Sequence, residues 1–234
     1  MAKAAAAKAE SLYSIHPGVL TMGKWLAELK GKTGRSLEEW LAFVEKEGPA
    51  TEAERREWLK KKHDLGTNSA WWIAEKSVGK GDEDETPEGY LRAAEKYVSE
   101  MYAGGKAGLR PIYDALLRLG LGIGDEAKAC PCKTMVPLYR NHVFAQIKPT
   151  TQTRVDLGFC FLKLGKKPPK RFIDTGGEKK GDRITHRVEI TSAKDIDGEI
   201  KGWLKVAYDL DGELKRPAPA KMARRHRETS ARRK

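Results

Sequence analysis

The first third of the chain repeats apolar residues at intervals of three and four, the spacing of one face of an α-helix. Residues 19–29 show this spacing and predict an amphipathic helix. Two more helix starts are marked by capping boxes, in which a hydroxyl and a carboxylate three residues apart each accept an N–H group. These pairs are Ser36 with Glu39 and Thr51 with Glu54. We therefore expect residues 12–78 to form a small all-helical module.

In the second half the apolar spacing changes to two. Residues 142–148 and 154–161 alternate as half-buried strands do, and residues 149–153 between them fit a hairpin loop. Further strands are expected in residues 171–174 and 183–191. Helices are expected before the strands, from Thr86-Pro87 and from about Leu109, and after them, with Ser192 as cap and Asp195 as its acidic partner. Helices on both sides of an antiparallel β-meander predict an α+β domain over residues 90–212.

Three segments have no apolar pattern. Residues 1–11 are rich in alanine and predict a flexible arm. Residues 79–89, with five acidic side chains and one lysine, predict an acidic linker that stays in water. Residues 213–234 hold nine Lys/Arg and two Glu, a charge of +7, and predict a disordered basic tail.

Several phrases of the sequence resemble an uncharacterised bacterial two-domain family. They are SLYSIHPGV, KTGRSLEEWL, ERREWLKKKH and LGTNSAWWIAE in the first half, and AGLRPIYDALL, CPCKTMVPLYRNHVFAQIKPTTQTRVDLG, RFIDTGG and DRITHRVEI in the second. The resemblance covers about residues 12–211 and implies domain of unknown function 4287 followed by domain of unknown function 5655. It implies an architecture but no activity and no catalytic residues. The second domain is also similar to domains attached to restriction-type nucleases, which implies a nucleic-acid context.

The net charge of +12 is concentrated in the second half of the chain. Residues 133–187 contain 13 Lys/Arg and four Asp/Glu, a surplus of nine. Such a surface attracts phosphates and releases counterions, so we expect contact with DNA or RNA backbone at low sequence specificity. The alternative is a solvated charge run that keeps strand edges from aggregating. The candidate contacts are Lys148, Arg154, Lys167, Lys170, Arg171, Lys180, Arg183, Arg187, Arg224 and Arg225.

The predicted hairpin gives this charge a local arrangement. With the loop centred at Thr151, Lys148 faces Arg154 across the two strands. Like charges directly opposite each other cost stability, so this pair is either solvated or holds an anion. The odd-numbered residues of both strands share the other face and are expected to form the core.

Residues 57–76 predict two helices joined by a turn at Leu65-Gly66, the outline of a helix-turn-helix. Asn68 and Ser69 would then stand at the start of the reading helix. Lys62 argues against this motif, because a small residue normally packs four positions before the turn glycine, and Trp72 is bulky for its position. A generic helical hairpin is therefore the favoured interpretation. Trp71 and Trp72 point about 100° apart, so one of them is expected to contact the other domain or a partner.

The sequence offers little for metal or catalytic chemistry. Cys130 and Cys132 form a Cys-x-Cys, whereas a structural zinc needs four ligands. Glu178-Lys179-Lys180 resembles a nuclease Glu-x-Lys but is flanked by glycines, which predicts a turn in place of a strand. We expect no metal, no cofactor and, more readily than an enzyme, a binding protein. His142, Trp71 and Trp72 are the candidate contacts of a partner or small ligand.

The apolar windows and the cysteines indicate the cellular compartment in which we expect the protein. No window approaches the roughly 20 apolar residues that span a bilayer, so no membrane segment is expected. Three cysteines do not make a disulfide framework, which is typical of a reducing cytosol. The sequence therefore predicts a cytoplasmic, non-catalytic protein that binds nucleic-acid backbone. The alternative is a regulatory module that binds a small ligand or a protein in a cleft between its domains. Neither functional hypothesis predicts an oligomeric state.

Overall fold

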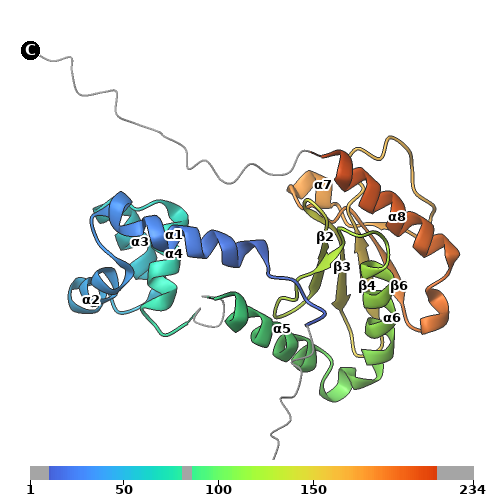
Figure 1. Ribbon diagram of the computed structural model, residues 1–234, viewed down its shortest axis with the longest axis horizontal. Helices are drawn as coiled ribbons and strands as arrows, with labels where there is room; N and C mark the ends of the chain where they lie inside the picture. The colour runs from blue at the N-terminus through green and yellow to red at the C-terminus, as the bar shows by residue number, and fades with distance from the viewer. Residues whose placement is uncertain (1–10, 81–85, 215–234) are drawn as a thin grey trace, which may run out of the picture.

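We describe the protein from a computed structural model, in which residues 11–80 and 86–214 are described. Residues 1–10, most of the predicted arm, lie outside these ranges, as do Arg224 and Arg225 of the predicted tail. Helices come first along the chain, and an antiparallel sheet with its own helices follows (Figure 1). The predicted α+β class is confirmed.

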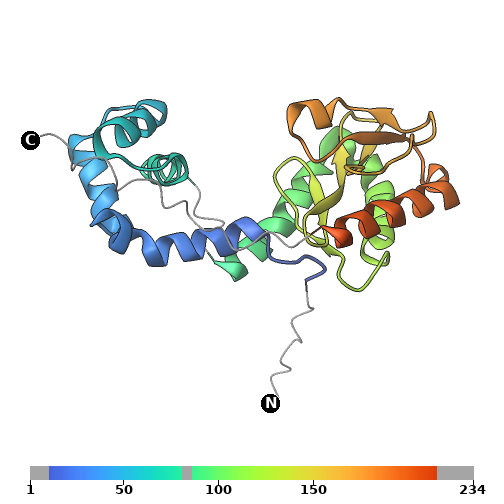
Figure 2. The same ribbon diagram turned by 90° about the horizontal axis from the view of Figure 1, so that it is seen from above.

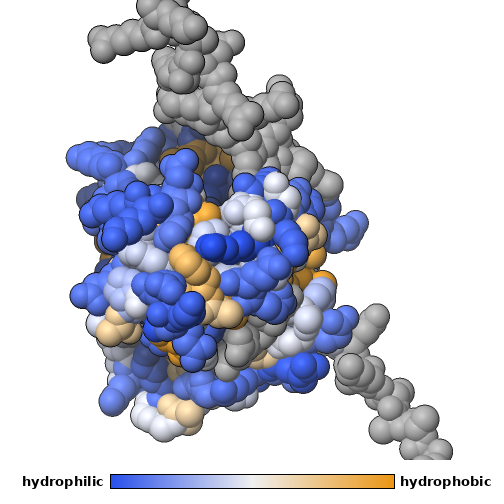
Figure 3. Space-filling view, turned by 90° about the vertical axis from the view of Figure 1, so that its left-hand side faces the viewer, coloured by the Kyte–Doolittle hydropathy of each residue, from blue (hydrophilic) through white to orange (hydrophobic). Residues whose placement is uncertain are grey.

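Four helices form the first part of the molecule. They are α1 (Pro17–Thr33), α2 (Leu37–Glu47), α3 (Glu52–His63) and α4 (Thr67–Lys76). Both predicted capping boxes are present, at the starts of α2 and α3. The helices enclose an apolar core whose best-buried members are Leu29, Val44, Leu59, Ala70, Ile73 and Ala74. Seen from the end opposite the sheet, this part of the surface is mostly hydrophilic, with small apolar areas between polar side chains (Figure 3).

The second part is a six-stranded antiparallel sheet in the order β1-β2-β3-β4-β6-β5. The strands are β1 (Lys128–Ala129), β2 (Val136–Tyr139), β3 (Val143–Pro149), β4 (Val155–Phe159), β5 (Ile173–Asp174) and β6 (His186–Ile190). The helical segments are α5 (Pro87–Met101), η2 (Gly104–Leu109), α6 (Arg110–Leu121), α7 (Gly177–Lys180), η3 (Ala193–Asp195) and α8 (Gly198–Glu213). Of these, α6 and α8 pack along the sheet (Figures 1 and 2).

The predicted core face of the hairpin is confirmed. Ala145 and Ile147 of β3 and Leu157 and Phe159 of β4 have no exposed surface. The predicted register is wrong by two residues, because Pro149 continues β3 and the loop consists of residues 150–154. Lys148 therefore lies opposite Asp156, an opposite charge, and does not face Arg154. The even-numbered face is unchanged, since a shift of two preserves alternation.

Two further expectations differ in detail. Ser192 and Asp195 do form a capping box, but they cap the short η3, and α8 begins after it with Asp197 as its cap. The segment 178–180, expected as a turn, is the short helix α7. It is not a strand, so the Glu-x-Lys likeness has no strand to support it.

Residues 11–16 run from the helical part to the edge of the sheet. The Ser14 N–H donates to the Ala129 carbonyl over 2.9 Å, extending the sheet beyond β1. The Tyr13 and Tyr113 hydroxyls are 3.0 Å apart. His16 caps α1 through Nδ1 and bonds the Tyr139 hydroxyl through Nε2 at 3.1 Å. We call residues 11–16 the strap.

Candidate nucleic-acid interface

The segment between β4 and β5 is a long connection that is anchored at both ends by aromatic rings. Phe161 and Phe172 are both buried, and their ring centroids lie 5.8 Å apart. The Trp203 ring of α8 contacts both, at 5.4 and 5.5 Å. The ten residues between the two phenylalanines are therefore held as a loop on the surface.

This β4–β5 connection carries lysines and no acidic side chain. The sequence has no Asp or Glu between Asp156 and Asp174. All four lysines in that interval have exposed side chains: Lys163, Lys166, Lys167 and Lys170. Lys166 lies over the Trp203 ring at 5.1 Å from its centroid. Within the described parts of the chain, none of the four forms an ion pair with a carboxylate. We call these four residues the lysine loop.

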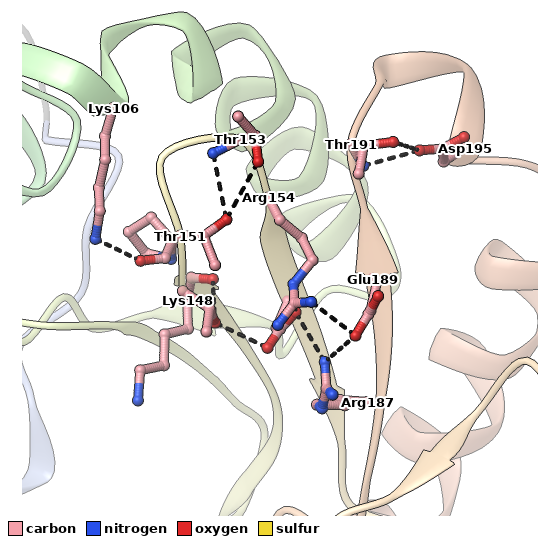
Figure 4. Close-up of polar contacts among 12 residues, drawn as sticks. Lys106, Lys148, Thr151, Thr153, Arg154, Arg187, Glu189, Thr191 and Asp195 are labelled. Atoms are coloured by element: carbon pink, nitrogen blue, oxygen red, sulfur yellow. Dashed lines mark hydrogen bonds and ion pairs between the residues drawn. The ribbon is translucent and has the colours of Figure 1, made fainter.

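The arginines near the hairpin are in a different situation (Figure 4). Arg154 Nε lies 2.9 Å from Asp156 Oδ1, and Arg154 Nη1 lies 2.9 Å from Glu189 Oε1. Arg187 Nη1 lies 3.1 and 2.8 Å from the same two oxygens. The hydrogen bond from Arg187 to Glu189 raises the pKa of the Arg187 guanidinium. Two positive and two negative charges offset each other here, so this cluster offers a polyanion no surplus charge.

Arg183 is bound to a buried carboxylate of α8. Its Nη2 donates to Asp211 Oδ1 over 2.9 Å, while the Asn141 and His142 N–H groups donate to Asp211 Oδ2 over 2.7 and 2.8 Å. His142 Nδ1 lies 3.3 Å from Asp211 Oδ1. His142, expected to contact a ligand, therefore belongs to a set of contacts that joins the turn before β3 to the end of α8.

Arg171 pairs at the other end of α8. Its Nη1 lies 2.5 Å from Asp197 Oδ2, and its Nη2 donates to the Asp195 carbonyl over 2.7 Å. The bond to Asp197 raises the pKa of Arg171. The four predicted arginines within the described residues are thus bound to carboxylates at three separate places.

The predicted lysines are less constrained. Lys148 points away from the arginine cluster in Figure 4 and has no ion pair within the described parts of the chain. Lys180 is exposed at the end of α7. Lys167 and Lys170 belong to the lysine loop. Sequence reasoning counted Lys163 and Lys166 in the basic surplus but named only Lys167 and Lys170 of the four as contacts, although the absence of acidic residues around all of them was a readable signal.

The two tryptophans separate as their angular spacing requires. Trp72 is half-buried and its ring lies 4.9 Å from that of Trp25 in the helical core. Trp71 is 42% exposed, with the Arg56 guanidinium 5.9 Å from its ring centroid. Trp71 is therefore the one available to a partner.

The cysteines have the character of packed side chains. Burial raises the pKa of Cys130 to about 12, and burial also raises that of Cys160. Both thiols are therefore protonated at neutral pH and poorly nucleophilic. In the described residues, no three His, Cys, Asp or Glu side chains are grouped as metal ligands. No helix of the described ranges is both long and apolar enough to cross a membrane.

Comparison with known families agrees with this division of the molecule. Residues 21–76 match the family described as Domain of unknown function (DUF4287), and residues 98–211 match Domain of unknown function (DUF5655). The chain is a DUF4287–DUF5655 protein. No curated protein and no solved structure matches it. The DUF5655 domain holds the lysine loop and the paired arginines, whereas the DUF4287 domain holds Trp71.

Proposed function

We propose that this DUF4287–DUF5655 protein is a non-catalytic binding protein that contacts nucleic-acid backbone through its lysine loop, with little reading of sequence. The observation that carries the proposal is the set of four exposed lysines with no carboxylate partner among the described residues. Unpaired ammonium groups can replace the counterions of a phosphate backbone, whereas the paired arginines cannot do so without breaking their own contacts.

Two further features support the proposal. The tail, residues 213–234, adds a sequence charge of +7, although most of it lies outside the described residues. Lys148 and Lys180 supply further cations without ion pairs in the described ranges. We also place the protein in a reducing, cytoplasmic setting, because Cys130 and Cys160 are free thiols.

The test is binding of the full chain to duplex and single-stranded DNA across a salt series. On duplex DNA, log K should fall against log salt with a slope of about −3 to −4 if all four lysines contact phosphates. Replacing Lys166, Lys167 and Lys170 by Gln should reduce the magnitude of that slope by about 2 to 3. Affinity should fall equally for all sequences.

The matched control removes the same charge elsewhere. Lys128, Lys194 and Lys201 are exposed lysines outside the loop, and their replacement by Gln also lowers the net charge by three. If this control weakens binding as much as the loop variant does, DNA affinity depends on the total charge of the protein and not on the position of the lysines. Affinity that does not change with salt would reject the proposal.

A second candidate is a regulatory module that binds a small ligand or a protein, favoured by the exposed Trp71. It predicts that tryptophan fluorescence responds to a member of a metabolite panel, and that DNA produces no response. A fluorescence change with DNA alone would leave the nucleic-acid proposal in place.

A further inference from the structure

The connection between α3 and α4 is a short, well-defined turn. It consists of Asp64, Leu65 and Gly66. Asp64 adopts the left-handed conformation, with φ at 52°, and the Leu65 N–H donates to the Leu59 carbonyl over 3.2 Å. Leu65 is 7% exposed and enters the helical core. A turn of three to four residues with a buried apolar side chain is what joins the two helices of a helix-turn-helix.

The packing of the two helices agrees with that motif. In Figures 1 and 2, α4 runs across α3 and does not lie beside it as an antiparallel partner. Ala70, Ile73 and Ala74 of α4 have no exposed surface, and the small alanines allow the helices to approach closely. A third helix, α2, also packs on α4.

The turn changes which residue stands at the position where a small side chain normally packs. The left-handed residue is Asp64 and not Gly66, so the position four residues before the turn is Lys60 and not Lys62. Lys60 is not small. Its ammonium turns outward to Glu57 Oε1 at 3.0 Å, so the charged end stays out of the space between the helices.

The opposite face of α4 is uncovered. Thr67, Asn68 and Trp71 are exposed along it, starting at the first helical residue. The last turn of α3, which leads into α4, is basic: Lys60, Lys61 and Lys62. Lys60 and Lys61 lie 3.0 and 3.4 Å from the carboxylate oxygens of Glu57, whereas Lys62 has no carboxylate partner within the described residues. Hydroxyl and amide groups at the start of a helix, flanked by cations, fit base edges and phosphates better than an apolar partner.

We propose that α3 and α4 form a DNA-binding helix-turn-helix in which the Thr67–Asn68–Trp71 face of α4 enters the major groove of duplex DNA. The groove, about 12 Å wide, admits one α-helix. Asn68 can pair with adenine through its amide, Thr67 can bond a base or phosphate, and Trp71 packs against the groove wall. This proposal goes beyond the lysine loop, which contacts the DNA backbone without distinguishing base sequences. Here the DUF4287 domain recognises the base sequence.

The experiment selects duplexes from a pool with a randomised central segment, using the full chain. We expect a preferred sequence to be enriched. Thr67→Glu and Asn68→Ala should each weaken binding to the selected duplex by about fivefold or more and lower its advantage over random duplex. Ala42→Glu, which adds a negative charge at an exposed position of α2, is the matched control and should change neither quantity.

The outcomes separate this inference from the proposed function. The lysine-loop variant should weaken binding to selected and random duplexes by the same factor. If α4 variants lose selectivity while the lysine-loop variant binds normally, the reading helix stands and the lysine proposal fails. The inference is overturned if no sequence is enriched, or if the folded α4 variants retain wild-type selectivity, even where the lysine loop proves to bind DNA.

Discussion

Asp211 is an acidic residue inside an apolar helix face, with 2% of its surface exposed. It lies four positions after Ala207, so helical spacing alone placed it toward the core, and sequence reasoning overlooked it. Its carboxylate receives two backbone N–H groups and the Arg183 guanidinium. A buried carboxylate is tolerated only when its oxygens are paired in this way.

We predict that Asp211→Asn destabilises the protein by about 1–3 kcal/mol, because two backbone N–H groups and the half-buried Arg183 guanidinium lose their charged acceptor. The free energy of unfolding, measured by urea titration, checks this. Asp209→Asn is the control on the same helix, since Asp209 is an exposed partner of Lys205 and its loss should cost about 1 kcal/mol or less. Equal losses would contradict the role given to Asp211.

His63 is a second residue whose environment sets its chemistry. Its ring meets those of Trp40, Phe43 and Trp58 edge-on. Burial lowers its pKa, and nearby Arg35 and Lys62 lower it further. Its Nε2 atom is buried and finds no hydrogen-bond partner within the described residues. The folded state therefore disfavours the charged imidazolium.

We predict that His63 makes the protein less stable as the pH falls. Below the unfolded-state pKa of about 6.5 the unfolded chain binds a proton that the folded chain does not, so stability drops until the pH reaches the lower folded-state pKa. His63→Phe keeps the aromatic packing and removes this titration. Urea unfolding between about pH 7.5 and 5.5 should show a smaller loss in the variant than in the wild type; parallel curves would refute this.

At the scale of elements, α6 depends on a glycine for its approach to the sheet. A Cβ atom at Gly120 would lie 2.5 Å from Leu138 Cδ1 of β2, and Leu138 is fully buried. One of the two must move, so the helix can approach β2 this closely only without a side chain at residue 120.

We predict that Gly120→Ala lowers stability by about 1–3 kcal/mol through overpacking. Gly202→Ala in α8 is the comparison, because nothing lies within 4 Å of its added Cβ atom. That variant should be neutral or up to about 1 kcal/mol more stable, since alanine favours helix. Thermal melting of both proteins checks the pair. A stable Gly120→Ala would mean that α6 and β2 can move apart freely.

Elements marked by local signals were predictable. Capping boxes predicted the starts of α2 and α3, and the alternation of apolar residues predicted which faces of β3 and β4 are buried. The strand β2 was missed because Val136, Pro137 and Leu138 are all buried, which removes alternation, and the proline argues against a strand. The hairpin register failed because it depended on whether Pro149 ended β3 or began the loop.

The candidate interface was harder to predict than the fold. Composition correctly located a basic segment. It did not show which cations were neutralised, because Arg171 and Arg183 bind carboxylates 26 and 28 residues further along the chain. Partners this distant are brought together only by the tertiary fold. Lysines in a stretch without acidic residues were easier to assess, since no local partner existed.

At the scale of the whole molecule, the two domains are joined by more than the linker. The strap bonds to β1 and α6, and α1 begins beside α5 and ends in the helical core. Val19 of α1 packs with Tyr90 and Ala94 of α5. The chain therefore connects the domains twice, once through α1 and once through residues 77–86.

We predict that the two parts remain together when the second connection is cut. A protease site placed at residues 78–80, which are exposed, allows cleavage of the folded chain, and the pieces should co-elute in size-exclusion chromatography. Tyr13→Ala together with His16→Ala removes the side-chain bonds of the strap and should promote separation. Separation of the unsubstituted pieces would show that the strap and α1 contribute too little to hold the domains.

The position of the strap also bears on how the DUF5655 domain is excised for study. A fragment limited to the matched residues 98–211 would lack Ser14 and most of α5, and the backbone of β1 would become an open edge. Exposed edges recruit strands from other molecules. Self-association of such a fragment would then reflect where the gene was cut, and would say nothing of how the intact protein assembles.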